Sequence, residues 1–145
     1  MPGHRLVSGW NLLAACLMLG ASSAAAAACN VSPQGVSFGN YDPLGGSAVD
    51  GVGNVNVSCD VPTSFTVSLG TGNGTVGDRR MTGAPAHLAY NLYQDSSRLL
   101  VWGEAGAGVS SSGTNIDLTV YGRIPGAQNV SANVYADSVT VTVAF

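Results

Sequence analysis

The 145-residue sequence contains no lysine, and only 9% of its residues are charged. Five arginines stand against eight acidic residues, which gives a net charge of −3. A surface that binds nucleic acid needs clustered positive charge, so this composition argues against nucleic acid as a partner. Disorder is disfavoured as well, because disordered chains combine low hydrophobicity with high net charge and this chain is 46% hydrophobic. The length is that of one domain with its own core.

Side chains that bind metals or perform catalysis are also scarce. The sequence has two histidines, and one of them, His4, lies in the N-terminal leader described below. The other, His87, cannot form a multi-histidine metal site, and no Gly-x-Ser-x-Gly motif accompanies it. Asp42 and Asp50 have a spacing that fits no calcium loop, so both are expected to cap turns. We therefore expect no enzyme activity, no metal and no cofactor.

Residues 1–28 have the pattern of a secretory signal peptide. Arg5 precedes an apolar run over residues 10–20, and small residues with five consecutive alanines follow it. The apolar run is too short for a membrane-spanning helix, which needs roughly 20 residues. Cleavage after Ala27 or Ala28 leaves a mature domain of residues 29–145. We therefore expect an exported protein with no membrane-spanning segment.

Two cysteines, Cys29 and Cys59, remain in the mature domain. Two cysteines in an exported chain predict one disulfide, and two unrelated buried thiols are the alternative. In the chain-entropy model, a bond that closes a loop of about 30 residues stabilises the fold by roughly 3–4 kcal/mol.

Hydrophobic residues of the mature domain recur with a period of two, which is typical of half-buried strands. The pattern is clearest at the end of the sequence, where Val139, Val141, Val143 and Phe145 alternate with Ser, Thr and Ala. Similar or shorter apolar segments lie at 36–38, 55–59, 65–69, 88–92, 99–102 and 116–124. About seven short strands predict an all-β, immunoglobulin-like antiparallel β-sandwich.

Glycine-rich stretches separate these segments. Residues 45–46 and 70–77 predict turns, and residues 103–113 predict a long loop. The charged run Asp78-Arg79-Arg80 is interpreted as a solvated turn rather than a binding site.

Five motifs occur in order at 38–43, 90–95, 101–103, 121–125 and 135–143. Together with one cysteine before the first motif and another at the end of the second strand, they resemble the spore coat protein U family. Members of that family include subunits of the archaic class of chaperone–usher pili. The resemblance covers essentially the whole of residues 29–145.

This resemblance implies an immunoglobulin-like sandwich that lacks its final strand, so that a groove exposes the core. A periplasmic chaperone lends the missing strand, and at the outer-membrane usher the N-terminal extension of the next subunit replaces it. The most regular apolar strand ends the sequence, which favours a free edge and β-augmentation there. We therefore expect Val139, Val141, Val143 and Phe145 to line the strand-acceptor edge or groove.

The expected partners are a periplasmic chaperone, an outer-membrane usher and neighbouring pilus or coat subunits. The expected location is the periplasm and then the cell surface or an extracellular fibre.

The segment ahead of Cys29 departs from the family pattern. A polymerising subunit has alternating apolar residues there, whereas residues 22–28 are only serine and alanine. Such small side chains fill an apolar groove poorly, so the chain is expected to accept a strand without donating one, at a pilus tip. A coat protein that does not polymerise, or a misassigned start or cleavage site, would explain the same pattern.

The alternative function is an autonomous secreted binding module, for example for carbohydrate. Such a module would use the aromatic residues and the 103–113 loop, and it would not polymerise.

Overall fold

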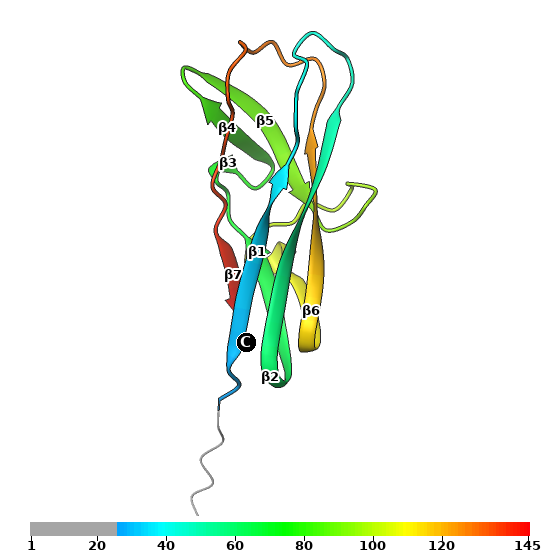
Figure 1. The fold of residues 1–145 in the computed structure, drawn as a ribbon, viewed down its shortest axis with the longest axis vertical. Helices are drawn as coiled ribbons and strands as arrows, with labels where there is room; N and C mark the ends of the chain where they lie inside the picture. Colours follow the sequence, from blue (N-terminus) through cyan, green and yellow to red (C-terminus); the bar gives the residue numbers. More distant parts are fainter. Residues whose placement is uncertain (1–25) are drawn as a thin grey trace, which may run out of the picture.

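The computed structural model describes residues 26–145, so the expected signal peptide falls almost entirely outside the described residues (Figure 1). The described chain is all-β, as predicted, with one short 3₁₀ helix. Its elements are β1 (Cys29–Ser37), β2 (Val49–Leu69), β3 (Asn73–Thr75), β4 (Asp78–Gly83), β5 (Ala86–Tyr93), η1 (Ala105–Ala107), β6 (Val109–Ile124) and β7 (Val141–Ala144). Across residues 26–145, no helix has the length and apolar character needed to cross a membrane.

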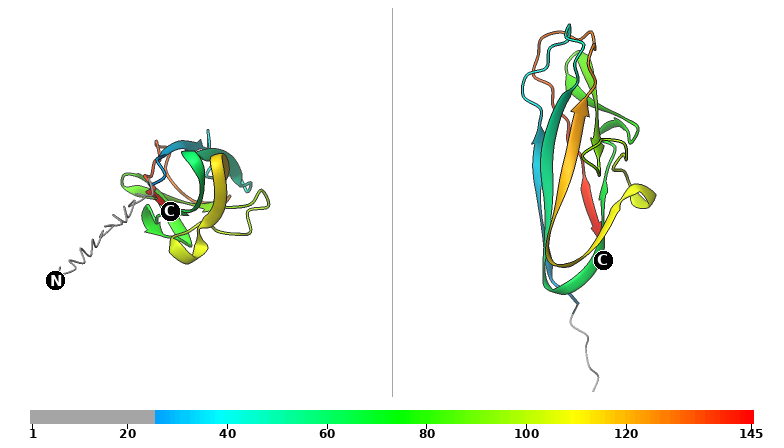
Figure 2. Two further views of the ribbon diagram at one scale, coloured as in Figure 1. Left: turned by 90° about the horizontal axis from the view of Figure 1, so that it is seen from below. Right: turned by 90° about the vertical axis from the view of Figure 1, so that its right-hand side faces the viewer.

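The seven strands form one curled antiparallel sheet in the order β1-β2-β6-β5-β4-β3, with β7 paired to β2. The long strands β2 and β6 stay paired through a bend, where the register shifts between Ser58 and Thr63 of β2. The right-hand view of Figure 2 shows both strands turning together at one end of the molecule. Each long strand therefore contributes to both layers of the sandwich.

The observed elements correct three expectations from the sequence. The segments 55–59 and 65–69 belong to the single strand β2, and the 103–113 stretch contains η1 and the beginning of β6. Gly113, with φ of +149°, occupies the corner of β6 where a side chain would be strained. The segment 99–102 forms only an isolated bridge between Val101 and Tyr93.

Strand β1 pairs with the edge of β2, and the side chains of Val36 and Phe38 at its end pack over glycines of β2 and β6. Gly51 of β2 pairs with Gly122 of β6. A Cβ atom on Gly122 would lie 2.6 Å from Cζ of Phe38, and one on Gly51 would lie 2.9 Å from Cγ1 of Val36. The glycines therefore leave room for these two side chains against the sheet.

The core is formed by the inward side chains of β2, β4, β5 and β6 together with Trp102. Trp102 is buried, and its indole Nε1 donates a hydrogen bond to the carbonyl oxygen of Val67 at 2.9 Å. The buried hydrophobic residues are Val55, Val57, Cys59, Phe65, Val67, Leu69, Met81, Leu88, Tyr90, Leu92, Trp102, Val120 and Ile124.

The interpretation of Asp78-Arg79-Arg80 as a solvated turn is wrong. These residues begin β4, and Arg79 is 0% exposed. Its guanidinium donates to the main-chain oxygens of Leu69, Gly70 and Trp102 at 3.2, 2.8 and 2.7 Å, and to Oδ1 of Asn91 at 2.7 Å. Burial lowers the pKa of Arg79. These acceptors replace the water that the buried guanidinium loses, so Arg79 can be buried without a carboxylate partner.

The two aspartates expected to cap turns behave differently from each other. Oδ1 of Asp42 accepts a hydrogen bond from the main-chain nitrogen of Leu44 at 3.0 Å, as a turn aspartate does. Asp50 instead lies in β2 and forms an ion pair with Arg123 at 2.7 Å. The expectation for Asp50 was wrong because a cross-strand partner, rather than a turn, satisfies its carboxylate.

Candidate strand-acceptor groove

A groove of about 970 Å³ opens onto the core of the sandwich. One wall is formed by residues 33–43, at the end of β1 and in the loop that follows it, and the other by residues 130–141. Figure 1 shows β1 (blue) and β7 (red) on the same side of the molecule. The floor consists of the core residues Val55, Leu69, Met81, Leu88, Tyr90, Leu92, Val120 and Ile124.

The four residues predicted from the terminal alternation do not share one environment. Val139 and Val141 line the groove, and Val139 lies just before the start of β7. Val143 packs against the core without lining the groove. Phe145 is 66% exposed, and its ring centroid lies 6.3 Å from that of Phe65. The structure thus places two of the four in the groove.

The 130–141 wall is fixed along one edge. Thr82 of β4 and Ala136 exchange main-chain hydrogen bonds of 2.8 and 3.2 Å, and Gly70 donates to the carbonyl oxygen of Thr140 at 2.9 Å. Farther along, Val141–Ala144 pairs with Thr66–Leu69 of β2. The even-numbered residues of this wall therefore direct their main-chain N–H and C=O groups toward β4 and β2.

The other edge of this wall faces the groove. Val139 has no main-chain hydrogen-bond partner within residues 26–145. Its side chain is half-buried, whereas the adjacent Ser138 and Thr140 are exposed. Strand β1 pairs with β2 alone, so its outer edge is also free within the described residues.

Tyr90 and Asp137 join the wall to the floor. The Tyr90 hydroxyl donates to Oδ2 of Asp137 at 2.7 Å, and the main-chain nitrogens of Asn73 and Ser138 donate to Oδ1 at 3.0 and 2.8 Å. Burial, followed by the hydrogen bond to Asp137, raises the pKa of Tyr90. Sequence reasoning missed this pair, although both residues lie in the motifs at 90–95 and 135–143.

The opposite wall was also missed, and the 38–43 motif is its signal. The Phe38 ring meets the Tyr90 ring edge to face, with centroids 6.0 Å apart. The Tyr41 hydroxyl donates to the carbonyl oxygen of Pro125 and accepts from the main-chain nitrogen of Gln128, both at 2.9 Å. The Tyr41 contacts attach this wall to residues 125–128.

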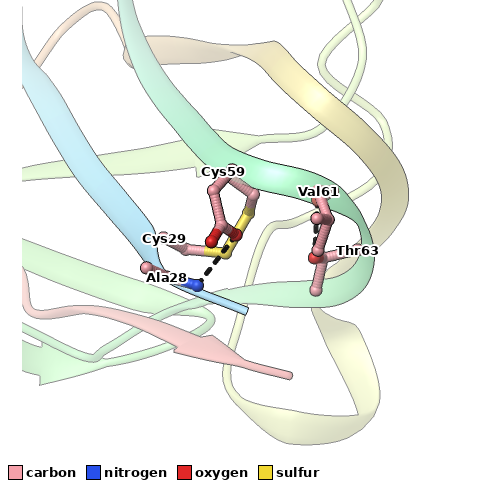
Figure 3. Close-up of a disulfide and its surroundings, with 6 residues drawn as sticks. Ala28, Cys29, Cys59, Val61 and Thr63 are labelled. Carbon is pink, nitrogen blue, oxygen red and sulfur yellow. Dashed lines mark hydrogen bonds between the residues drawn. A yellow bond between two sulfur atoms is a disulfide. The ribbon is translucent and has the colours of Figure 1, made fainter. Parts of the chain in front are cut away.

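Cys29 and Cys59 form a disulfide that joins the first residue of β1 to its partner on β2 (Figure 3). Next to it, the main-chain nitrogen of Ala28 donates to Oδ1 of Asp60 at 2.9 Å. The groove wall on this strand begins farther along, at Pro33. The disulfide therefore anchors β1 at the end that does not line the groove.

The chemistry available in the described part of the chain is limited. Residues 26–145 contain no group of three or more His, Cys, Asp or Glu side chains placed to hold a metal ion. His87 is exposed on β5, with Nδ1 3.4 Å from the Thr82 hydroxyl. The arrangement instead offers an apolar cleft with two free strand edges.

Comparison with known proteins identifies the family of this chain. The Spore Coat Protein U domain profile matches residues 15–142. The chain belongs to the Spore Coat Protein U domain family. It is also 34% identical over 127 residues to Protein U of Myxococcus xanthus, with 76% of this chain and 71% of that protein covered. The resemblance found in the sequence is confirmed.

Two solved structures are similar to this Spore Coat Protein U domain. One is the CsuC–CsuE chaperone–tip adhesion subunit pre-assembly complex of archaic chaperone-usher Csu pili from Acinetobacter baumannii, with a TM-score of 0.60 and 27% identity. That match covers 83% of this chain but only 40% of the other. The second is the E. coli Hda pilus minor tip subunit, HdaB, with a TM-score of 0.41, 18% identity and 79% of each chain covered.

Proposed function

We propose that this Spore Coat Protein U domain is an exported structural subunit of a surface pilus or coat-like assembly. Its groove accepts an extended strand, first from a periplasmic chaperone and then, at an outer-membrane usher, from a neighbouring subunit. The observation that carries this proposal is the groove of about 970 Å³ whose floor is the hydrophobic core.

A single extended strand meets both needs of this groove. Its alternate side chains can cover the apolar floor, and its main chain can pair with the free edges of β1 and of the 130–141 wall. A small ligand would satisfy the floor but leave the edges unpaired. The geometry therefore favours a peptide strand over a small molecule.

The comparisons support the choice of partners. The similar Csu subunit was solved in a pre-assembly complex with a chaperone. Family membership and the signal-like residues 1–28 support export to the periplasm and then to the cell surface.

We propose a tip position as a finer part of this function. The serine and alanine residues at 22–28 are poorly suited to fill an apolar groove, and the similar Csu subunit is a tip adhesion subunit. N-terminal sequencing of the mature protein and a polymerisation assay test this position. Homopolymers formed by the purified chain, with an N-terminus at Cys29, would refute it.

Two adjacent substitutions test the groove. Val141→Asp places a carboxylate among the apolar groove residues, which costs several kcal/mol when the groove is filled. Thr142→Asp places the same charge on the exposed side of β7. Each variant is co-expressed with the cognate chaperone, and co-purification of the two chains is measured. We expect Val141→Asp to abolish capture and Thr142→Asp to retain it.

Equal effects of the two substitutions would contradict the assignment of the groove. Amide hydrogen exchange adds an independent measurement on the wild-type chain. The Val139 amide should exchange rapidly in the isolated chain and slowly once a strand occupies the groove. An autonomous binding module would instead be a stable monomer whose Val139 amide is unaffected by the chaperone.

A further inference from the structure

The two edges of the strand-acceptor groove differ in the main-chain groups that they offer to an inserted strand. In an antiparallel pair, residues that exchange hydrogen bonds with the partner strand alternate with residues whose N–H and C=O groups point the other way. The pairing of each wall with β2 therefore shows which of its residues direct these groups toward an incoming strand.

The edge on the β7 side offers both donors and acceptors. Gly70 donates to the carbonyl oxygen of Thr140 at 2.9 Å, and β7 continues this pairing with β2. The alternate residues Val139, Val141 and Val143 therefore direct their N–H and C=O groups away from β2. Because β7 pairs with β2 alone in the described part of the chain, these groups are free to pair with a strand.

The edge formed by β1 is incomplete. The main-chain nitrogen of Asp60 donates to the carbonyl oxygen of Ala28 at 3.0 Å, and the pairing with β2 continues in register to Gln34. The even-numbered residues therefore face β2, whereas Val31 and Pro33 direct their main-chain groups outward. Proline has no N–H group, so the outward position at residue 33 offers an acceptor but no donor.

Pro33 lies at the point where this gap affects the groove. It is the first residue of β1 that lines the groove, and it is exposed there. Beyond it the pairing of β1 with β2 shifts between Gln34 and Ser37, so the regular alternation of the edge ends as well. A proline on an edge strand blocks the continued addition of another strand. The part of β1 that faces the groove therefore has no continuous run of donors.

On the basis of the proposed function, we infer that Pro33 makes the main-chain pairing of the inserted strand one-sided. The strand pairs continuously with Val139, Val141 and Val143, which set its register. Beside β1 it can donate to the Pro33 carbonyl oxygen, but it receives no hydrogen bond in return. Pro33 is thus a positioning residue, because it prevents an occupant from being held by the β1 edge alone.

Hydrogen exchange of the complex with the co-expressed cognate chaperone tests this pairing. In the wild type, the Val139, Val141 and Val143 amides should exchange about tenfold or more slowly in the complex than in the isolated chain. The Val31 amide should change by less than about twofold, because a strand that reached it would have to pair past Pro33.

Matched substitutions separate the main-chain donor from the side chain. Val139→Pro removes the groove-facing N–H, whereas Val139→Ala keeps it, so the chaperone complex of Val139→Pro should be weaker by about tenfold or more. Val31→Pro and Val31→Ala form the corresponding pair on β1 and should differ by less than about twofold. Pro33→Ala should bind the chaperone at least as tightly as the wild type, and the amide that it adds at position 33 should exchange more slowly in the complex.

Three results would overturn the inference and leave the groove assignment intact. They are protection of the Val31 amide equal to that of Val139, an equal proline-over-alanine loss at these two positions, and loss of chaperone capture by Pro33→Ala. Failure of the proposed function gives a different result, because no amide at 139, 141 or 143 would then be protected by the chaperone.

Discussion

Arg79 is a fully buried cation that has no carboxylate within ion-pair distance in residues 26–145. Main-chain carbonyl oxygens and the Asn91 amide oxygen satisfy it instead. The Arg79 side chain therefore links three segments that are not paired with one another in the sheet: the end of β2, the beginning of β4 and the segment around Trp102. Its removal leaves several buried acceptors without donors.

We expect Arg79→Met to lower the free energy of unfolding by about 3 kcal/mol or more, because buried hydrogen bonds to a charged group are lost and their acceptors stay buried. Arg80→Met is the neighbouring control. Arg80 lies on the exposed side of β4 and pairs with Asp78 at the surface, so its loss should change stability little. Denaturant unfolding measures both, and equal losses would contradict the role of Arg79.

Tyr90 makes the stability of the domain sensitive to pH in the alkaline range. Burial and the Asp137 hydrogen bond raise its pKa in the folded state, whereas the unfolded chain loses this proton near pH 10. The folded state therefore keeps a proton that the unfolded state releases, and the free energy of unfolding falls as pH rises above about 10.

Tyr90→Phe should reduce stability by about 1 kcal/mol at neutral pH, through loss of the hydrogen bond to Asp137. It should also flatten the decline of stability above about pH 10, which urea unfolding at a series of pH values measures. Tyr93→Phe is the control, because it leaves Tyr90 and Asp137 in place. A Tyr90→Phe variant with the wild-type slope would exclude this explanation.

At the scale of elements, the packing of Val36 and Phe38 at the end of β1 depends on glycines of β2 and β6. A Cβ at Gly122 would lie within 2.8 Å of both Phe38 and Val36. We expect Gly122→Ala to cost about 1–3 kcal/mol, because both side chains must move off the sheet. Gly35→Ala is the control within β1, since nothing lies within 4 Å of its added Cβ. Thermal unfolding of the two variants should differ, and identical melting temperatures would contradict the packing.

The sequence predicts elements well where period two continues without interruption, as it does after residue 138. It fails at the bends of β2 and β6. Pro62 and Gly113 are ordinary turn signals, so β2 looks like two separate strands and β6 looks like a long loop followed by one strand. Sequence alternation located one wall of the groove through Val139 and Val141. The wall formed by residues 33–43 was missed, because the 38–43 motif marks this segment but only tertiary packing places it opposite the first wall.

Arg79 was misjudged for a related reason. Adjacent charged residues usually indicate a solvent-exposed segment. Only in the folded chain do the carbonyl groups of Leu69, Gly70 and Trp102 surround the Arg79 side chain.

For the molecule as a whole, the disulfide stabilises the fold mainly by reducing the conformational entropy of the unfolded chain. Replacing both Cys29 and Cys59 by alanine should lower the free energy of unfolding by roughly 3–4 kcal/mol, as expected for a closed loop of about 30 residues. Denaturant unfolding of the double variant measures this loss. Mass spectrometry of the exported wild type, alkylated without reduction, should find neither thiol modified. Two alkylated thiols would contradict the bond.

The same disulfide determines how the domain responds to a pulling force. It spans 30 positions of the chain, from the first residue of β1 to β2. At roughly 3.4 Å per extended residue, that is about 100 Å of contour length. A molecule pulled from its two ends cannot release this length while the bond is intact, because tension passes directly from Cys29 to Cys59. Even after every strand has separated, an oxidised domain therefore stretches less far than a reduced one.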